Sequence, residues 1–456
     1  MVEKALHENI SFMWISGMQR PDFKTLNNFR LRLGGDIKKT FKEIVKFGME
    51  CGVIKGKDIF IDHTKIEANA NQYKVIWRKN VDRQLENIEK ELEQLFFEID
   101  NLNNEEDQVY GNESIVELQK ILTNEQLDSL VERVNERMKS GEMEKEEGRN
   151  TKKKLRRAKE LNDRRVVYKR KKEILGNRNS YSKTDIDAPA MKVKNSDDIK
   201  PSYNEGIATE NRFVIDFVVS QNAADNTSFK ELTEGTIANL EKVPDNVSAD
   251  SAYGNRENYE YLEEKGINNY VKYGAFQLDE KKEKRNIKEG KNEELPIREG
   301  FVYDAENDSF ICRNNCILSF QNEQEEIRKT GYKEKVDIYS ANESDCSGCP
   351  LREECTKGKC RTLTVSWKFE EQKAQVRENM KSEKGKEMRC RRGHEVETVF
   401  GDMKMNHKRK RYILRGKWKV ELEAGLFYMT SNIKRMYFYI MGQLCPDDIK
   451  GVFITS

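Results

Sequence analysis

The fold is decided by the stretch Asp58-Ile59-Phe60-Ile61-Asp62-His63-Thr64-Lys65-Ile66, which follows two glycines at 52 and 56. Its β-branched and aromatic residues predict a short strand that is largely buried on both faces. Phe60, Asp62 and Thr64 alternate onto one face of that strand. A carboxylate on a buried strand is costly unless it is paired or binds a cation, so Asp62 is a candidate site residue.

More strands are predicted downstream. Residues 202–209 and 212–221 form two strand-like runs separated by Glu210-Asn211, which is the pattern of a hairpin. The elements that follow alternate in type: a helix at 229–241, a short strand that begins at 246, a helix at 255–265 and a strand at 268–272. This order predicts a mixed α/β fold, in which helices cover a mixed sheet.

Residues 78–175 have a different pattern. Leucines and isoleucines from Leu85 to Leu102 recur at spacings of three and four, which predicts a coiled-coil seam. The run Lys152–Lys172 then holds twelve Lys and Arg residues against two acids. We predict an antiparallel helical hairpin inserted into the sheet domain, and the alternative is a spacer without functional contacts.

The N-terminal residues are predicted to be helical, with a break at Gly34-Gly35. They form either a small DNA-binding unit or a packing element. The patterns together predict five regions: 1–52, the helical N-terminal region; 53–77 with 200–275, the sheet core; 78–180, the helical or coiled-coil insertion; 276–370, a Cys-rich insertion; and 371–456, a helical region that completes the core.

Composition limits the class of protein. In 456 residues, 82 Lys and Arg stand against 80 Asp and Glu, so the net charge of +2 identifies no partner. No window of about 18–20 residues lacks charges, so we expect no membrane span. The N-terminus has no cleavable apolar region, so we expect no secretory signal.

Two further acids complete a candidate site. Asp250 stands near the end of a second short apolar strand, and two carboxylates on neighbouring strands favour a divalent metal because they otherwise repel each other. Glu397 is the candidate third acid. Two aspartates and a glutamate on a mixed sheet predict two-metal phosphoryl transfer, in which Mg²⁺ or Mn²⁺ ions about 3.5–4 Å apart activate a water or a 3′-hydroxyl.

The surroundings of Glu397 predict a helix. The apolar residues Val396, Val399, Phe400 and Met403 follow helical spacing and form a buried stripe. Glu397 and Lys404 lie at its border two turns apart, so the acid can reach a metal while the lysine reaches a phosphate. Glu395 points about 200° away around the helix and is the fallback.

Three ordered blocks of this sequence resemble bacterial insertion-sequence transposases of the DDE class. The blocks are residues 60–71, which read FIDHTKIEANAN; Ala249-Asp250-Ser251-Ala252-Tyr253-Gly254; and Val396-Glu397 through Phe400-Gly401 to Lys404, followed by Arg415-Gly416 and residues 421–432. The resemblance covers nearly the whole chain from about residue 8.

The resemblance implies a ribonuclease-H-like fold with insertions, and cleavage and transfer of DNA strands at the terminal inverted repeats of an insertion sequence. It implies that Asp62, Asp250 and Glu397 are the metal-binding catalytic triad and that Lys404 contacts the transferred strand. The implied partner is double-stranded DNA at the element ends and the target, bound by a homodimer. The implied location is the bacterial cytoplasm, in association with the nucleoid.

Three departures from the family leave other interpretations open. Family members usually have Gly after the first acid, where His63 stands, and many have Arg four residues before the Glu, where Gly393 stands. Relatives also tend to carry a longer helical N-terminal region before the segment that matches residues 9–20. The alternative is therefore an inactive, truncated remnant that only binds DNA. A third interpretation is a scaffold built on residues 78–175.

Six of the nine cysteines fall between Cys312 and Cys360, which favours a metal over a disulfide framework. The spacing Cys346-x-x-Cys349, followed by Cys355 and Cys360, is typical of a structural zinc site. The resemblance favours Cys312, Cys346, Cys349 and Cys355 as the zinc ligands. Cys316 and Cys360 are rivals for the fourth place, and reduced cysteines without metal are the alternative.

A basic run, Lys404–Lys419, holds eight basic residues and no acid. Because it begins on the third-acid helix, we predict that it contacts DNA phosphates beside the metals and makes binding salt-dependent. The predicted contacts are Lys404, Lys408, Arg409, Lys410, Arg411 and Arg415. Tyr412 and Trp418 either stack on bases or pack inward.

Overall fold

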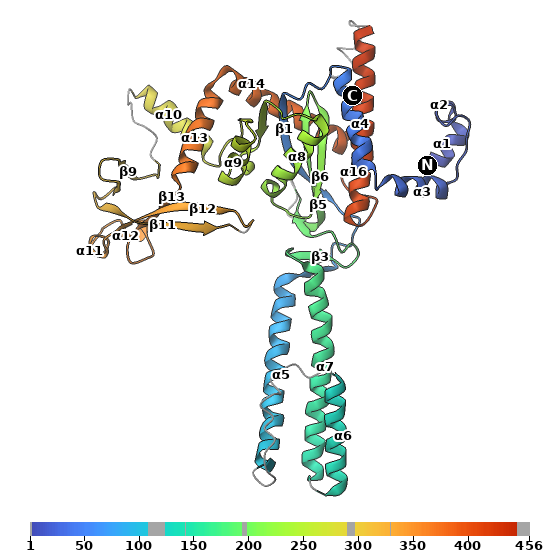
Figure 1. Ribbon diagram of the computed structural model, residues 1–456, viewed down its shortest axis with the longest axis vertical. Coiled ribbons are helices and arrows are strands. Elements are labelled where there is room, and N and C mark those ends of the chain that lie inside the picture. Colours follow the sequence, from blue (N-terminus) through green and yellow to red (C-terminus); the bar gives the residue numbers. More distant parts are fainter. Residues whose placement is uncertain are drawn as a thin grey trace. The chain divides into compact units, whose positions relative to one another are not determined.

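The computed structural model describes residues 2–107, 124–141, 143–193, 198–289, 297–328 and 330–444. The chain divides into two compact units, one made of Met1–Ile66 with Asn204–Ser456 and the other of Glu67–Tyr203 (Figure 1). The five predicted regions are a finer division and stay a prediction. Four of them, 1–52, 78–180, 276–370 and 371–456, include residues outside the described ranges.

The first unit is built on a mixed sheet with the strand order β6-β5-β1-β7-β8. The strands are β1 (Asp58–Glu67), β5 (Ile199–Glu210, from residue 204 in this unit), β6 (Phe213–Ser220), β7 (Asn246–Ala249) and β8 (Asn268–Asn269). Strands β5 and β6 are antiparallel, whereas β7 runs parallel to both β1 and β8. The predicted mixed α/β fold is therefore confirmed.

Helices from distant parts of the chain bury the sheet. Helices α4 (Ile37–Glu50), α8 (Phe229–Leu240) and α16 (Lys417–Leu444) all contact β6. The Phe217 ring of β6 lies 5.1 Å from the ring of Phe41 in α4 and 5.7 Å from that of Tyr428 in α16. Because both faces are covered, the β-branched and aromatic run of β1 is fully buried.

A buried aspartate, Asp216, links helix α4 to the sheet through hydrogen bonds. Asp216 of β6 is 4% exposed, and its Oδ1 accepts hydrogen bonds from Lys38 Nζ at 3.3 Å and Asn239 Nδ2 at 3.1 Å. Lys38 also donates to the carbonyl oxygen of Phe217. Burial raises the pKa of Asp216 to about 6, although Lys38 acts in the opposite direction. The native protein therefore holds this proton to a higher pH than the unfolded chain does.

Asp216→Asn should remove a specific pH dependence of stability. Because the native pKa is raised above its unfolded value, ionisation of Asp216 destabilises the fold as pH rises from about 4 to about 6. The quantity to compare is the free energy of unfolding of the natural chain minus that of Asp216→Asn. We expect this difference to fall by about 3 kcal/mol over this pH range and to stay constant above pH 7. Denaturant titrations of both proteins at several pH values measure it. A difference that rises with pH would instead mean that the Lys38 ion pair outweighs burial.

The segment that carries the predicted third acid crosses the sheet. It consists of α14 (Glu383–Arg392), the π-helical turn η4 (Gly393–Glu397), α15 (Thr398–Gly401) and a second π-helical turn, η5 (Asp402–Asn406). The predicted apolar stripe is buried. The prediction of regular helical spacing was incomplete, because a π turn holds more residues than an α turn and shifts the faces that follow it.

The remaining elements of this unit form its N-terminal helices, its short connections and a second sheet. The helices are α1 (Val2–Glu8), α2 (Ile10–Ile15), α3 (Phe23–Leu33), η2 (Asp225–Ser228), η3 (Ser251–Tyr253), α9 (Arg256–Glu264), α10 (Phe276–Lys288), α11 (Glu343–Ser347), α12 (Arg352–Cys355) and α13 (Trp367–Lys381). The second sheet has the order β13-β12-β11-β10-β9 and is antiparallel. Its strands are β9 (Phe301–Asp304), β10 (Ser309–Cys312), β11 (Ile317–Ile327), β12 (Lys333–Ala341) and β13 (Thr362–Val365).

The second unit is a helical arm. Its elements are β2 (Val75–Trp77), α5 (Arg78–Asp107), α6 (Asn124–Ser140), α7 (Lys145–Leu175), β3 (Ser180–Ser182) and β4 (Ala190–Lys192). Helix α7 contacts both α5 and α6. Part of the predicted seam, Ile88 and Leu92, is buried in a cluster with Leu127, Leu155 and Leu161.

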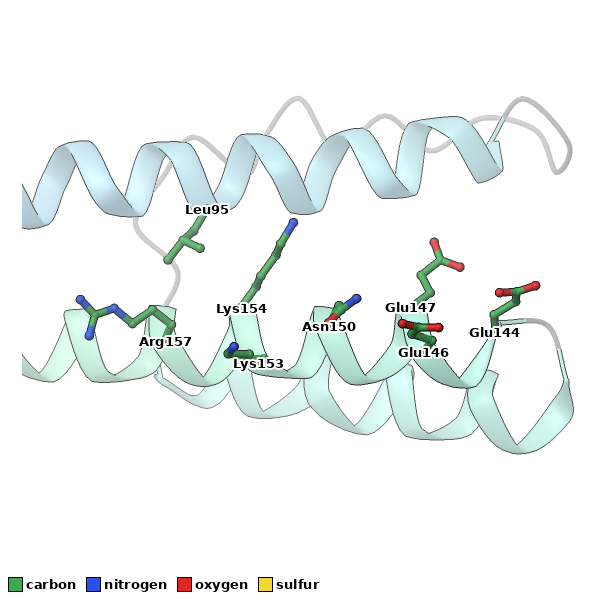
Figure 2. Close-up of a pocket in the computed structure, with 8 residues that line it drawn as sticks. All are labelled: Leu95, Glu144, Glu146, Glu147, Asn150, Lys153, Lys154 and Arg157. Carbon is green, nitrogen blue, oxygen red and sulfur yellow. The ribbon is translucent and has the colours of Figure 1, made fainter.

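A hollow of about 620 Å³ lies in this arm (Figure 2). Leu95 of α5 and charged side chains of α7 line it. Two of its cations are paired with acids of α5: Lys154 with Glu98 at 2.8 Å and Arg157 with Glu91 at 2.7 Å. These ion pairs hold the two helices together, and we place no site there. Within the described parts of the chain, no helix is long and apolar enough to cross a membrane.

Candidate active site

The parallel pairing of β1 and β7 brings two predicted acids together. Ile61 is the partner of Ala249, so Asp62 and Asp250 follow at the same level, on strands that lie about 4.8 Å apart. Each carboxylate accepts a backbone hydrogen bond from the residue after it: Asp62 Oδ1 from His63 at 2.8 Å, and Asp250 Oδ1 from Ser251 at 2.7 Å. Asp62 is half-buried and Asp250 is exposed.

The charges of both acids act on the buried Tyr253 hydroxyl. The pKa of Tyr253 lies well above its usual value because of burial and because the charges of Asp62, Asp225 and Asp250 disfavour a phenolate. The third of these acids, Asp225, accepts a hydrogen bond from Asn204 Nδ2 at 2.7 Å. Sequence reasoning missed Asp225, because it follows β6 in a polar loop that matches no motif.

His63 lies on the other face of β1 from Asp62, since neighbours on a strand alternate. Its Nδ1 lies 2.6 Å from the Tyr253 hydroxyl, and its ring occupies the space that the missing side chain of Gly206 leaves. Burial lowers the pKa of His63 to about 4, so the ring is neutral at pH 7. This geometry makes His63 a packing residue behind the acids.

Two contacts fix the path of the segment that carries Glu397. The Arg391 guanidinium lies 5.1 Å from the centre of the Phe60 ring and donates to Asp58 at 2.7 Å. Lys404 Nζ donates to the Thr64 hydroxyl. Since Phe60 and Thr64 flank Asp62 on one face of β1, the intervening Glu397 is carried across the strand near the level of Asp62.

Glu395, the fallback candidate for the third acid, has a structural role. Glu395 is buried; its Oε2 accepts the Arg212 backbone N–H at 2.6 Å and its Oε1 accepts a hydrogen bond from Arg391 at 3.2 Å. Glu397 is exposed on the same segment. Because its carboxylate is occupied by these two partners, Glu395 is a structural acid, and Glu397 remains the candidate.

We tested the acids against the requirements of a metal site. Across the described ranges, no three His, Cys, Asp or Glu side chains lie close enough together to hold a metal ion. Asp62 and Asp250 nevertheless offer solvent-accessible carboxylates on neighbouring strands, which is the donor chemistry that Mg²⁺ requires. Glu397 is exposed and does not form such a group with them in the described chain.

The basic run is divided between exposed and buried residues. Lys408, Lys410, Arg411 and Arg415 are exposed, as a contact to DNA requires. Arg409 is 9% exposed and binds the fully buried Glu205 through two hydrogen bonds of 2.9 and 3.0 Å. The structure therefore argues against the predicted DNA contact at Arg409, because a guanidinium that balances a buried carboxylate has no access to phosphates.

Glu205 is the centre of a buried polar network. The hydroxyls of Tyr412 and Tyr428 also donate to its carboxylate. Burial acts to raise the pKa of Glu205, but Arg409 and the two hydroxyls outweigh it, so the pKa is lowered. Tyr412 is fully buried and therefore packs inward, whereas Trp418 is 51% exposed.

Arg409→Met should destabilise the protein by about 3–5 kcal/mol, because it leaves the buried Glu205 carboxylate without its cation. The neighbouring Lys410→Met, which removes an exposed charge, should change stability by less than about 0.5 kcal/mol. Denaturant unfolding of both variants measures the difference. Equal stabilities would contradict a structural role for Arg409.

The cysteines of the second sheet surround a small cavity of about 20 Å³. Its lining includes Cys312, Cys316, Cys346, Cys349 and Cys355. Cys316 donates its backbone N–H to Cys312 Sγ at 3.3 Å, and burial and Cys312 raise the pKa of Cys316. Cys360 is not among the residues that line the cavity, and its sulfur lies 3.3 Å from the Ser340 hydroxyl. The described cysteines are all free thiols.

Comparison with known proteins gives a match over part of the chain. Residues 311–437 match the model of a family described as a transposase DDE domain. This range contains Glu397, Lys404 and the six clustered cysteines, but neither Asp62 nor Asp250. No curated protein and no solved structure matches the chain. This match supports a DDE-class transposase, and it rests on residues 311–437.

Proposed function

We propose that the chain is the transposase of a bacterial insertion sequence, which cuts and joins DNA strands at the terminal inverted repeats of its element. Asp62, Asp250 and Glu397 are the proposed triad, and Mg²⁺ or Mn²⁺ the proposed cofactor. The observation that carries the proposal is the pairing of β1 with β7, which puts Asp62 and Asp250 at one level of the sheet while Arg391 and Lys404 hold the Glu397 segment across the same face.

The sheet supports a ribonuclease-H-like fold for the catalytic unit. The strands β1, β5 and β6, which come first along the chain in this unit, lie side by side, and β7 and β8 follow as parallel strands on the other side of β1. This arrangement is the one that places the ends of β1 and β7 next to each other.

The residues have distinct proposed tasks. The carboxylates would hold the divalent ions, and Lys404 would hold the phosphate of the transferred strand near Asp62. When bound, the ions lower the pKa of the attacking water or hydroxyl and stabilise the leaving oxygen. The exposed cations Lys408, Lys410, Arg411 and Arg415 would contact the DNA backbone on either side.

A strand-cleavage assay on duplex DNA that carries the element end tests the proposal. We expect cleavage with Mg²⁺ or Mn²⁺ and none when both ions are omitted. Because joining two ends needs two active sites, we also propose a homodimer on DNA, which sedimentation of the complex would detect. Binding without cleavage under all these conditions would contradict the proposed activity.

The second candidate is a remnant that binds DNA and does not cut it. The observation in its favour is that, in the part of the chain that the structure describes, no three candidate ligands approach one another closely enough for a metal. The same cleavage assay separates the two candidates, since the remnant binds with a salt-dependent affinity and produces no cut strand.

We propose further that the cysteine cavity binds one structural zinc ion. The close sequence spacing and the shared cavity support this, and the cavity favours Cys316 over Cys360 as the rival ligand. Because no three described side chains lie close enough together to hold a metal ion, the cysteines would have to move together when zinc binds. Cys312, Cys346, Cys349 and Cys355 remain the first choice. A zinc ion would stabilise a sheet that has only a small apolar core.

A further inference from the structure

A second cavity, of about 160 Å³, opens beside Asp250. Its walls come from the end of β7, from the chain after β8 and from the helices α10, α13 and α14. The volume is several times what one water molecule needs. Three cations line it, namely Lys272, Arg389 and Arg392, together with the aromatic rings of Tyr270 and Phe276.

Only one of the three cations is balanced by a neighbouring acid. Arg389 binds Glu280 through two hydrogen bonds of 2.9 and 3.1 Å. For Lys272 and Arg392, no described carboxylate lies within the 4.0 Å of an ion pair. The cavity therefore holds more positive charge than the single Asp250 carboxylate can offset.

The pKa of Lys272 is lowered, in agreement with this excess of positive charge in the cavity. Burial lowers the pKa of Lys272, and the charges of Arg389 and Arg392 lower it further, against the weaker opposite effects of Glu280 and Asp250. A lysine that was simply the partner of Asp250 would have a raised pKa. An added anion would relieve the repulsion among the cations.

We propose that this cavity binds a backbone phosphate of the DNA strand next to the bond that is cut, with Lys272 and Arg392 as its cationic ligands. Arginine and lysine in a concave, partly dry wall are the side chains that bind phosphate most strongly. The assignment of this phosphate to the DNA strand that is cut follows from the position of the cavity next to Asp250, and it rests on the proposed function. Binding of a phosphate in the cavity does not depend on the proposed function.

Thymidine 3′,5′-bisphosphate is the minimal probe, because it carries the two phosphates of one nucleotide. Calorimetric titration of the full chain without added Mg²⁺ or Mn²⁺ should show that Lys272→Met and Arg392→Met each weaken binding about tenfold, as the loss of one charge-assisted hydrogen bond predicts. The matched control is Lys281→Met, which removes an exposed lysine of α10 outside the cavity and should change affinity less than twofold.

Thermal unfolding controls for loss of the fold. Because the charge of Lys272 is unfavourable in the free protein, Lys272→Met should melt at the same temperature as the natural chain or higher. Weaker binding by a variant of unchanged stability supports the site. Binding that neither Lys272→Met nor Arg392→Met weakens would overturn it.

Two comparisons separate this site from the proposed function. If inorganic phosphate binds as tightly as the bisphosphate, the cavity is a general anion site and its assignment to a DNA strand is overturned. Glu397→Gln should bind the bisphosphate within twofold of the natural chain. A chain that binds the bisphosphate through Lys272 but never cuts DNA would support the phosphate site and contradict only the enzyme.

Discussion

Replacing any one acid of the proposed triad should reduce strand cleavage by about a thousandfold or more. The variants are Asp62→Asn, Asp250→Asn and Glu397→Gln, which keep the shape of each side chain and remove its charge. A thousandfold loss corresponds to about 4 kcal/mol of transition-state stabilisation. We expect it to exceed the ten- to hundredfold effect of losing an outer partner of a metal site, because each acid would bind the ion directly.

Glu383→Gln is the matched control for Glu397→Gln. Both acids lie on the segment that crosses the sheet, and the Glu383 side chain is 92% exposed and paired with Lys386 on the same helix. Cleavage of end-containing DNA should survive in this control. DNA binding, measured in Ca²⁺, should survive in all four variants. If one triad variant cuts like the natural chain, that residue is not a member of the triad.

Removal of zinc should unfold the second sheet. A structural zinc site contributes about 10–16 kcal/mol in small domains. The apolar cluster of the second sheet, around Phe310 and Tyr339, would be supplemented by it. Native mass spectrometry should find one zinc ion for each chain. Incubation with a chelator should expose backbone amides of residues 301–365 to hydrogen exchange and leave β1 protected.

Cys349→Ser tests the site with a matched control. Cys349 lines the cysteine cavity, whereas Cys390 is exposed on α14 and outside it. We expect Cys349→Ser to lose the zinc ion and to show the same exchange as the chelated protein, while Cys390→Ser keeps both metal and protection. A metal-free natural chain with a fully protected second sheet would rule the zinc site out.

Much of the candidate site was predictable because its signals are local. The β-branched and aromatic residues of 58–66 predicted β1, and the apolar spacing around Glu397 predicted a buried stripe. Both patterns are formed by residues that are neighbours in the sequence. Apolar spacing did not predict the π-helical turns η4 and η5, which interrupt the α-helix within this stripe. A π turn depends on how side chains such as Arg391 and Lys404 reach the strand beneath, which the spacing of apolar residues does not encode.

The sequence by itself determined the mixed α/β class, the position of β1 and the residue types of the proposed site, because periodicity and side-chain chemistry are properties of short segments. Only the tertiary structure decided which charges are available. Arg409 and Lys410 are adjacent and alike in sequence, yet one balances the buried Glu205 and the other is exposed. Likewise Lys272, Arg392 and Asp250 come from distant segments and share one cavity. Burial and charge pairing depend on contacts between residues far apart in the chain, and no local pattern records them.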